Sequence, residues 1–545
     1  MSRARRYWWA VVLVVVVALL AQGTARAAGN PVSPYGGLSS SQRASLLAIA
    51  RDTWKLYGAD VDQATGLPMD NITFAGGSAT PTGSGRYTSA ANIGVYLWAV
   101  VAARDLGLVS EPQARARIQA TLTEVTHLKR DNGFLYQWYD TTNGNVLTNP
   151  GQGDCTETNP SAPAFDNCFF ISNVDNGWYA SGLIVVRQAM PELSHLVNSL
   201  LAPMNFGLFY DARAETHCNV NPAITGNQPT GQMFGGYYVG LPPDAGDNWT
   251  HYYHNGALYS DPRISAYIGM GLHQMPGNVW WRSWRELPPP APFADCQSTD
   301  PDFSWQGQWP MAGSWQTYTD PQSGQKFPVW EGHYTYPGSG LTFIPTYSGG
   351  MFEGLMPNEI VPETSWGTRS FGLADARTAQ VQIKYATQQL HDPVWGMSPS
   401  STADDTGGYG GYGVEGLAFP YFGTGADASH PNQGLSQCHG CATEDVVTPH
   451  ASFLALDVAP QQAFANITAL RSRYPGVYGA DGFFDAVNPT TGAVGHRDLV
   501  LDQSMIMAAL DNALRDRALQ RDFARDPVSW AAHTYLSMET MSITG

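Results

Sequence analysis

Four glutamates lie in one aromatic-rich stretch between residues 330 and 367. The stretch reads W-E-G-H-Y-T-Y, then S-G-G-M-F-E-G-L-M-P-N-E, then P-E-T-S-W-G, without lysine or arginine, and its acids are Glu331, Glu353, Glu359 and Glu363. A carboxyl group among aromatic side chains and far from cations tends to hold a raised pKa, because burial disfavours the charged form. A raised pKa suits a general acid at neutral pH. A buried helix with solvated acids around it would give the same pattern for any one of them.

Three aspartates elsewhere lie beside aromatic or apolar residues. Asp485 occurs in G-F-F-D-A-V-N, Asp502 in L-V-L-D-Q-S-M and Asp175 in S-N-V-D-N-G-W. Burying an aspartate is costly unless it is paired or hydrogen-bonded. Asp485 and Asp502 are therefore each a structural ion-pair member or a site residue, and we favour a site role for Asp485. Asp175 lies in the first turn of a predicted helix, where capping alone could explain a carboxylate.

Flat aromatic side chains beside acids suit sugar rings, which offer apolar C–H faces and hydroxyl rims. Trp178 follows Asp175, and Trp138 lies in a predicted hairpin (D-N-G-F-L-Y-Q-W-Y-D) whose face could instead be packed. Tyr409 lies in a glycine-rich run after W-G-M-S-P-S, where glycines let the backbone approach a ligand but also suit a flexible loop. The residues predicted to contact sugar are Asp175, Trp138, Trp178, Trp366, Trp395, Tyr409 and Asp502.

The amino terminus has the pattern of a secretion signal. A basic start precedes an apolar run over residues 7–20, and Ala25-Arg26-Ala27 is a small-x-small cleavage site. We therefore expect a signal peptide over residues 1–27 and a secreted, extracellular protein, because no later stretch is apolar for long enough to cross a bilayer. The net charge of −17 argues against nucleic acid and anionic membrane as partners.

Six cysteines in an exported chain predict disulfides. Cys155 and Cys168 flank a short loop and are expected to pair, and Cys438 and Cys441 form a C-H-G-C loop staple. By elimination, this leaves Cys218 with Cys296.

No cofactor or metal is expected from the motifs. His251 and His254 lie one turn apart if helical, but there is no H-E-x-x-H pattern and no evident third ligand. There is also no dinucleotide fingerprint and no G-x-S-x-G elbow.

Helical periodicity recurs along the whole chain and predicts about twelve helices joined by long aromatic loops. Such a series suggests an all-α fold, an (α/α)6 toroid of six helical hairpins with minor β-hairpins, whose loops at one rim build the site. We expect one domain over residues 28–545, with a possible loop insertion over 288–324. The predicted helices span 41–57, 88–106, 111–128, 172–188, 192–201, 261–270, 349–356, 375–390, 449–456, 460–474, 499–511 and 516–523.

Eight motifs in order resemble the glucoamylase-like family, which includes endo-β-1,2-glucanases and the transglycosylating domain of cyclic β-1,2-glucan synthases. They are S-N-V-D-N-G-W, Y-S-D-P-R-I-S-A-Y-I, W-E-G-H-Y-T-Y, S-G-G-M-F-E-G-L-M-P, W-G-M-S-P-S, V-V-T-P-H-A-S-F-L-A-L, Y-G-A-D-G-F-F-D-A-V-N and L-D-Q-S-M-I-M. The similarity runs from about Thr88 to Arg525. It implies an (α/α)6 toroid and acid/base catalysis without a cofactor.

The resemblance also implies roles for individual residues. Asp485 matches a catalytic carboxylate of the related enzymes and becomes the first choice for base or nucleophile. The chain departs from the family at two positions that hold a glutamate in relatives: it has His254-Asn255-Gly256 in place of Y-N-E, and Pro399 in place of the glutamate of W-G-x-S-E-S. By elimination, Glu331 is the first candidate for the general acid and Glu353 the second.

The sequence thus predicts a secreted glycoside hydrolase that acts on an extracellular polysaccharide or oligosaccharide, such as a β-glucan. The missing glutamates leave open a non-catalytic glycan-binding protein on an inactivated scaffold. A polysaccharide lyase is a weaker third hypothesis, because a lyase needs cationic groups and this chain is strongly acidic.

Overall fold

The computed structural model describes residues 35, 37–148, 150–151, 155, 169–212, 214–215, 228–229, 231–239, 255–283, 285, 312–336, 338–344, 346, 349–414 and 445–543. The predicted signal peptide, His251, His254 and every cysteine except Cys155 lie outside these ranges, so the predictions about them stay predictions. Within the described ranges, no helix is both long enough and apolar enough to cross a membrane.

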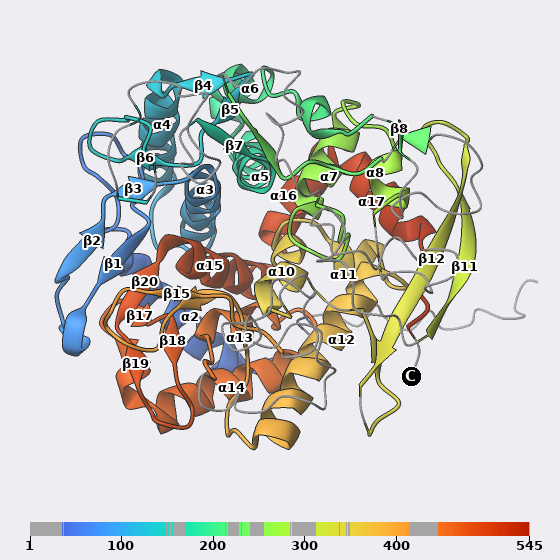
Figure 1. The fold of residues 1–545 in the computed structure, drawn as a ribbon. Coiled ribbons are helices and arrows are strands. Elements are labelled where there is room, and N and C mark those ends of the chain that lie inside the picture. The colour runs from blue at the N-terminus through green and yellow to red at the C-terminus, as the bar shows by residue number, and fades with distance from the viewer. Residues whose placement is uncertain are drawn as a thin grey trace, which may run out of the picture.

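The described part of the chain is mostly helical (Figure 1). Its α-helices are α2 (Ser40–Leu56), α3 (Ala90–Asp105), α4 (Glu111–His127), α5 (Asn173–Ala189), α6 (Ser194–Leu201), α7 (Arg263–Gly271), α8 (Asn278–Trp281), α10 (Met351–Leu355), α11 (Glu363–Trp366), α12 (Phe371–Lys384), α13 (Pro449–Leu454), α14 (Pro460–Arg473), α15 (Val500–Leu514), α16 (Ala518–Arg525) and α17 (Ser529–Met538). A π-helical turn, η7 (Tyr385–Leu390), extends α12.

Short antiparallel strands lie in the loops between the helices. They are β1 (Asn71–Thr73), β2 (Gly83–Gly85), β3 (Tyr87–Thr88), β4 (Arg130–Asp131), β5 (Phe134–Leu135), β6 (Tyr139–Asp140), β7 (Phe170–Ser172), β8 (Ala214–Glu215), β9 (Gln228–Pro229), β10 (Gly236–Tyr238), β11 (Ala312–Thr319), β12 (Lys326–Thr335), β13 (Thr342–Phe343), β14 (Ser400–Ser401), β15 (Tyr409–Gly410), β16 (Tyr478–Gly479), β17 (Gly482–Phe483), β18 (Ala486–Val487), β19 (Val494–Gly495) and β20 (Arg497–Leu499).

The apolar helices pack against one another in the middle of the molecule. Helix α3 is buried on every side from Ala90 to Ala103, as its nearly continuous apolar sequence requires, and it packs against both α5 and α15. Contacts then lead from α5 to α7, from α10 to α13 and from α13 to α15. Helices α7 and α10 are joined by hydrogen bonds from Arg263 to the backbone of α10. Six helices therefore form a closed series of neighbours.

More polar helices cover this inner series from outside. Helix α2 packs on α15, α4 on α3, α6 on α5, α12 on α10 and α14 on α13. The C-terminal helix α17 packs on α7. No helix was predicted at α17 from the sequence, although α7 depends on it for cover.

The starts of the inner helices are tied together in pairs. Asp70 accepts a hydrogen bond of 3.0 Å from the Asn92 side chain in the first turn of α3, and its carbonyl oxygen accepts one of 2.9 Å from Val500, the first residue of α15. The Ser265 hydroxyl of α7 donates to the carbonyl oxygen of Asn173, the first residue of α5. The segment 396–398 receives backbone N–H groups from the starts of α10 and α13. The loops before these helices therefore meet at one end of the molecule.

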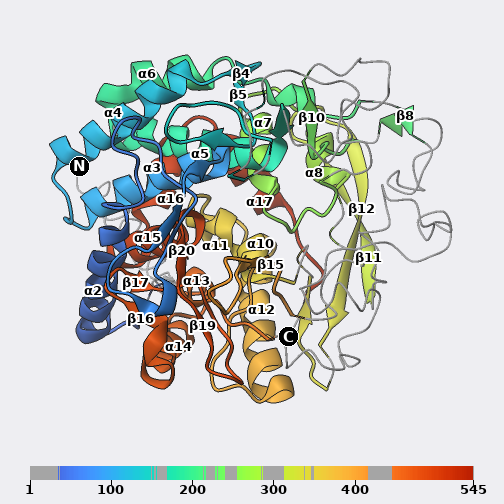
Figure 2. The same ribbon diagram turned by 60° about the vertical axis from the view of Figure 1, so that its left-hand side comes forward.

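A long hairpin of β11 and β12 replaces part of the region expected to be an insertion. Its strands are antiparallel with Trp315 opposite Trp330, and β13 adds a third strand. Residues 286–311 lie outside the described residues, so an insertion there stays a prediction. Strand β12 carries Glu331, for which a helix had been the structural alternative, and it lies at the right-hand side of both views (Figures 1 and 2).

Candidate active site

Tyr409 lies within electrostatic reach of four carboxylates near the end where the inner helices begin. Burial among protein atoms raises the pKa of the Tyr409 hydroxyl, and the negative charges of Asp502, Glu353, Asp70 and Asp261 raise it further. The Tyr409 side chain nevertheless stays 56% exposed. Tyr409 is therefore open to solvent and within electrostatic reach of carboxylates from four separate segments.

Asp261 and Glu353 form a carboxyl pair on one side of Tyr409. Their side chains share a hydrogen bond, which requires a proton between them. Burial is the main cause of the raised pKa of Glu353, and the charge of Asp261 adds to it. Two further donors fix the pair: the Ser260 hydroxyl lies 2.9 Å from Glu353 Oε2, and Trp178 Nε1 lies 3.2 Å from Asp261 Oδ2. Glu353 is only 7% exposed, and its raised pKa favours the protonated form.

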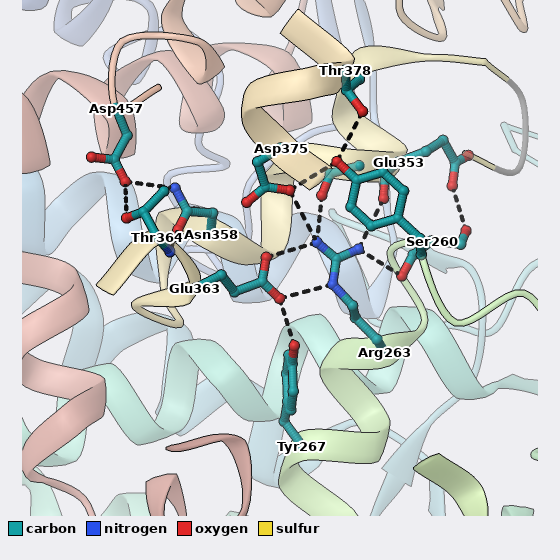
Figure 3. A network of polar contacts seen from close by, with 12 residues as sticks. Ser260, Arg263, Tyr267, Glu353, Asn358, Glu363, Thr364, Asp375, Thr378 and Asp457 are labelled. Atoms are coloured by element: carbon teal, nitrogen blue, oxygen red, sulfur yellow. Dashed lines mark hydrogen bonds and ion pairs between the residues drawn. The ribbon is translucent and has the colours of Figure 1, made fainter. Parts of the chain in front are cut away.

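The backbone that carries this pair is held by a buried arginine (Figure 3). Arg263 forms a bidentate ion pair with Glu363, with both N–O distances at 2.8 Å, and Tyr267 donates to the same carboxylate at 2.6 Å. The guanidinium also donates to backbone carbonyl oxygens beside both acids. Glu363 is therefore a structural acid, paired with Arg263.

Asp485 and Asp502 form a second group of acids, tied to the segment opposite Tyr409. Asp485 accepts hydrogen bonds from Ser401 Oγ at 3.0 Å, from the Leu499 backbone at 2.8 Å and from the Gln503 side chain at 3.1 Å. Asp502 Oδ2 accepts one from Ser400 Oγ at 2.6 Å. Ser401 is the strand partner of Tyr409, so β14 and β15 connect this group to the ring.

The second group has a distinctive electrostatic environment. Burial and the charge of Asp502 raise the pKa of Asp485. His450 Nδ1, at the start of α13, lies 3.1 Å from Asp502 Oδ2. Asp502 Oδ1 is buried without a hydrogen-bond partner among the described residues. An unpartnered buried carboxylate oxygen is costly, and it marks a place where water or a ligand hydroxyl would be stabilised.

Asp175 also belongs to this end of the molecule. It lies in the first turn of α5, where its backbone N–H donates to the N-cap Ser172. Burial, with a smaller contribution from the charge of Asp261, raises the pKa of Asp175 to about 6. The structure therefore places Asp175 near the Asp261–Glu353 pair, where the sequence had left capping as an equal explanation.

Glu331, the first candidate for the general acid, is not brought together with Asp485. It is buried on β12, accepts a hydrogen bond of 2.8 Å from Tyr318 and lies near the Arg285–Glu539 ion pair. Burial, then the charge of Glu539, raises its pKa to about 8. The raised pKa expected from the sequence is present, but Glu331 does not lie beside Asp485: β12 lies at the right-hand side of Figures 1 and 2, and β17, just before Asp485, at the left.

Most of the predicted tryptophan platforms are also corrected. Trp178 is 2% exposed and packs edge-on against Trp98, so it holds Asp261 instead of facing a sugar. Trp395 is 5% exposed within the main hydrophobic core. Trp366 packs against His533 of α17, away from the carboxylates. Trp138 is half-buried edge-on against Tyr87, which in turn interacts with Asp70, so its predicted sugar contact stays a prediction.

Sequence reasoning missed Asp261, Asp70 and the serine pair Ser400-Ser401. Asp261 had a visible signal, because it lies in the family-like motif Y-S-D-P-R. The serines follow Pro399, where the departure from the family had drawn attention. In the described ranges, no three His, Cys, Asp or Glu side chains are arranged to hold a metal ion.

Comparison with known protein families shows what this chain is similar to. Residues 326–527 match the family model described as "Putative glucoamylase", and residues 48–206 match "Protein of unknown function (DUF3131)". The resemblance to glucoamylase-like proteins is confirmed. The match to the first model includes Glu331, Glu353, Asp485 and Asp502, and the second includes Asp175.

The chain is also similar to individual relatives and to solved structures. A segment of 200 residues, 35% of this chain, is 31% identical to the cyclic beta-(1,2)-glucan synthase NdvB of Rhizobium meliloti, and it covers only 6% of that protein. The endo-beta-1,2-glucanase of Chitinophaga pinensis, solved with sophorotriose and glucose, is similar at a TM-score of 0.58 and 13% identity, over 91% of this chain and 98% of that one. The endo-beta-1,2-glucanase of Talaromyces funiculosus, solved with sophorose, gives 0.57 and 10%, over 92% and 91%. At these identities, the structural matches show a shared fold.

Proposed function

We propose that this chain is a secreted glycoside hydrolase with an (α/α)6 toroid fold, and that it cleaves an extracellular β-glucan such as β-1,2-glucan. The observation that carries the proposal is the position of Tyr409, which is influenced by the charges of Asp261, Glu353 and Asp502 and is the strand partner of Ser401, the serine bound to Asp485. The similarity to endo-β-1,2-glucanases over almost the whole chain supports both the fold and the substrate class. The closed series of inner helices, covered by outer ones, is the arrangement that a toroid requires.

In the proposed reaction, Glu353 is the general acid. It is the protonated member of a buried carboxyl pair, so it can deliver its proton to the glycosidic oxygen as the C1–O bond breaks. The Glu353 carboxylate that remains is then close to the charge of Asp261, which favours the return of a proton after the product leaves. Asp175, whose pKa is raised to about 6, would accept a hydrogen bond from a sugar hydroxyl.

The second carboxylate comes from the Asp485–Asp502 group. Burial and the charge of Asp502 act on Asp485, and one carboxylate of this group activates water or attacks C1. The family resemblance favours Asp485, and the unpartnered Oδ1 favours Asp502. Tyr409 is recessed and open, so its ring or hydroxyl orients the sugar between the two groups.

A non-catalytic glycan-binding protein is the second candidate function. The observation that favours it is the glycine at position 256 and the proline at position 399, where relatives carry glutamate. In that account the four carboxylates around Tyr409 bind sugar hydroxyls and transfer no proton.

Incubation of the purified protein with a panel of glycans separates these candidates. Linear β-1,2-glucan is compared with α-glucans, β-1,3-glucans and arabinans, with reducing ends measured and products separated. The proposal expects new reducing ends from β-1,2-glucan, lost on Glu353→Gln and on at least one of Asp485→Asn and Asp502→Asn. If β-1,2-glucan raises the melting temperature and no glycan of the panel is cleaved, the binding protein is the correct account.

A further inference from the structure

We propose that Arg263 is the positioning residue of the acid pair: its guanidinium joins the backbone before α7, which carries Asp261, to the backbone of α10, which carries Glu353. The inference rests on the proposed function for its meaning in catalysis. Its physical content, the placement of Glu353 against Asp261, can be tested without turnover.

The hydrogen bonds of Arg263 support this role. Nη1 donates to the carbonyl oxygens of Ser260 at 3.0 Å and Glu353 at 3.3 Å, and Nη2 donates to that of Gly354. Ser260 precedes Asp261 directly and its hydroxyl also reaches Glu353 Oε2. One planar group therefore ties together the two segments whose side chains must meet.

Every donor of the guanidinium is used. Nε and the remaining N–H of Nη2 donate to Glu363, both at 2.8 Å, so the five donors meet five acceptors. Tyr267 donates to Glu363 (Figure 3). The rings of Tyr259 and Phe371 each lie 5.2 Å from the guanidinium carbon. The arginine is thus fixed from all sides, and lysine, with three donors on one nitrogen, cannot replace it.

A second buried arginine shows what a purely structural ion pair looks like in this chain. Arg285 pairs with Glu539 with the same bidentate geometry, at 2.6 and 2.9 Å, and both side chains are fully buried. Its backbone acceptors are Trp280 and Ser283, in its own segment. Arg285 therefore closes a local turn against the C-terminal region, whereas Arg263 connects segments that are 90 residues apart in the chain.

The effect expected when Arg263 is replaced follows from the groups that face the Asp261–Glu353 pair. They are Asp175 on α5, Arg263 on α7 and Tyr409 on β15. When Arg263 no longer holds both backbones, Glu353 separates from Asp261 and loses its neighbouring negative charge. The pKa of Glu353 then falls toward its ordinary value, and the rate declines at a lower pH, because a general acid must be protonated to act.

The test compares Arg263→Lys with Arg285→Lys, using linear β-1,2-glucan as the substrate. For Arg263→Lys we expect at least a tenfold loss of kcat, a smaller change of KM, and an alkaline limb of the kcat profile shifted to lower pH by one unit or more. Arg285→Lys should lower the melting temperature while the pH profile stays in place. If Arg263→Lys does not fold, Glu363→Asp and Glu539→Asp form the second pair of variants. Each keeps the negative charge of the arginine's partner and shortens its side chain by one methylene.

An infrared measurement makes the result independent of turnover. The spectrum of the wild type minus that of Glu353→Gln should contain the band of a protonated carboxyl group. The same difference is then taken in the Arg263→Lys background, between Arg263→Lys and the double variant Arg263→Lys with Glu353→Gln. There the band should disappear at a lower pH than in the wild-type background. Equal pH dependence of the band with and without Arg263 would overturn the inference, as would its absence from the wild type. A band that behaves as expected in a protein that cleaves no glucan would refute the hydrolase and keep the positioning role.

Discussion

Tyr409 lies directly opposite Ser401 in the paired strands β14 and β15, and the Ser401 hydroxyl donates to Asp485 at 3.0 Å. This short pair of strands therefore connects the one strongly exposed tyrosine of the described residues to a buried acid of the site. The relationship explains why a residue in a glycine-rich loop can be held precisely. It also makes Tyr409 a direct probe of substrate contact.

We expect Tyr409→Ala to raise KM for β-1,2-glucan by about tenfold, because one aromatic sugar contact is of the order of 1.4 kcal/mol. The free energy of unfolding should change by less than about 0.5 kcal/mol, since the side chain is largely exposed. Trp315→Ala is the matched control, because Trp315 is also exposed, at 40%, but belongs to the β11–β12 hairpin. Steady-state kinetics with chemical denaturation checks both; an equal rise of KM in the two variants would argue against a site role for Tyr409.

Asp175 gives a pH-dependent prediction for stability. Its pKa is about 6 in the folded chain against an ordinary 3.8, so the folded state binds its proton more tightly than the unfolded state does. Stability is therefore lost as the pH rises from about 4 to 6. Asp175→Asn removes this loss: we expect equal stability below pH 4 and a gain of about 1–3 kcal/mol above pH 6, reduced by the partial exposure of the side chain.

Urea unfolding from pH 3.5 to 8 measures this difference. Asp404→Asn serves as a control of opposite sign, because hydrogen bonds from Thr406 lower the pKa of Asp404. That variant should lose stability at neutral pH relative to acid pH. A stabilising effect of Asp175→Asn that does not vary with pH would show that charge burial is not its cause.

Gly94 is required where α3 crosses α5. A Cβ at this position would lie 2.6 Å from the backbone carbon of Trp178 and 2.7 Å from the Cα of Tyr179, and backbone atoms cannot move aside as a flexible side chain can. We expect Gly94→Ala to cost about 1–3 kcal/mol despite the better helix propensity of alanine. Gly340→Ala, where nothing lies within 4 Å, should be nearly neutral. Equal stability of the two variants would contradict this packing.

The helical framework was predictable because its signals are local. The apolar run of α3, the serine caps at Ser39 and Ser89 and the proline at the start of α14 are written in contiguous sequence. Most observed helices begin and end within two or three residues of the prediction. Helix α17 was missed because its apolar residues are interrupted by polar ones and its cover comes from α7, which is distant in sequence.

The site was predictable only in part, because it depends on pairings between distant segments. Asp485 and Asp175 were found from their aromatic neighbours and the family motifs. Aromatic surroundings pointed to Glu331 because they report burial, and burial alone raises a pKa whether or not a site is near. The Asp261–Glu353 pair could not be seen, since nothing local shows that the Y-S-D-P-R segment meets the S-G-G-M-F-E-G segment through Arg263.

The most direct measurement is kcat on linear β-1,2-glucan for Glu353→Gln beside Glu331→Gln. Both variants replace a buried acid of raised pKa by its neutral amide, so they differ in place and not in chemistry. We predict a loss of about 10²- to 10⁴-fold for Glu353→Gln, partly restored with a glycosyl fluoride whose leaving group needs less protonation, and a rate within a few-fold of wild type for Glu331→Gln. A near-normal rate for Glu353→Gln together with a collapse for Glu331→Gln would contradict the account.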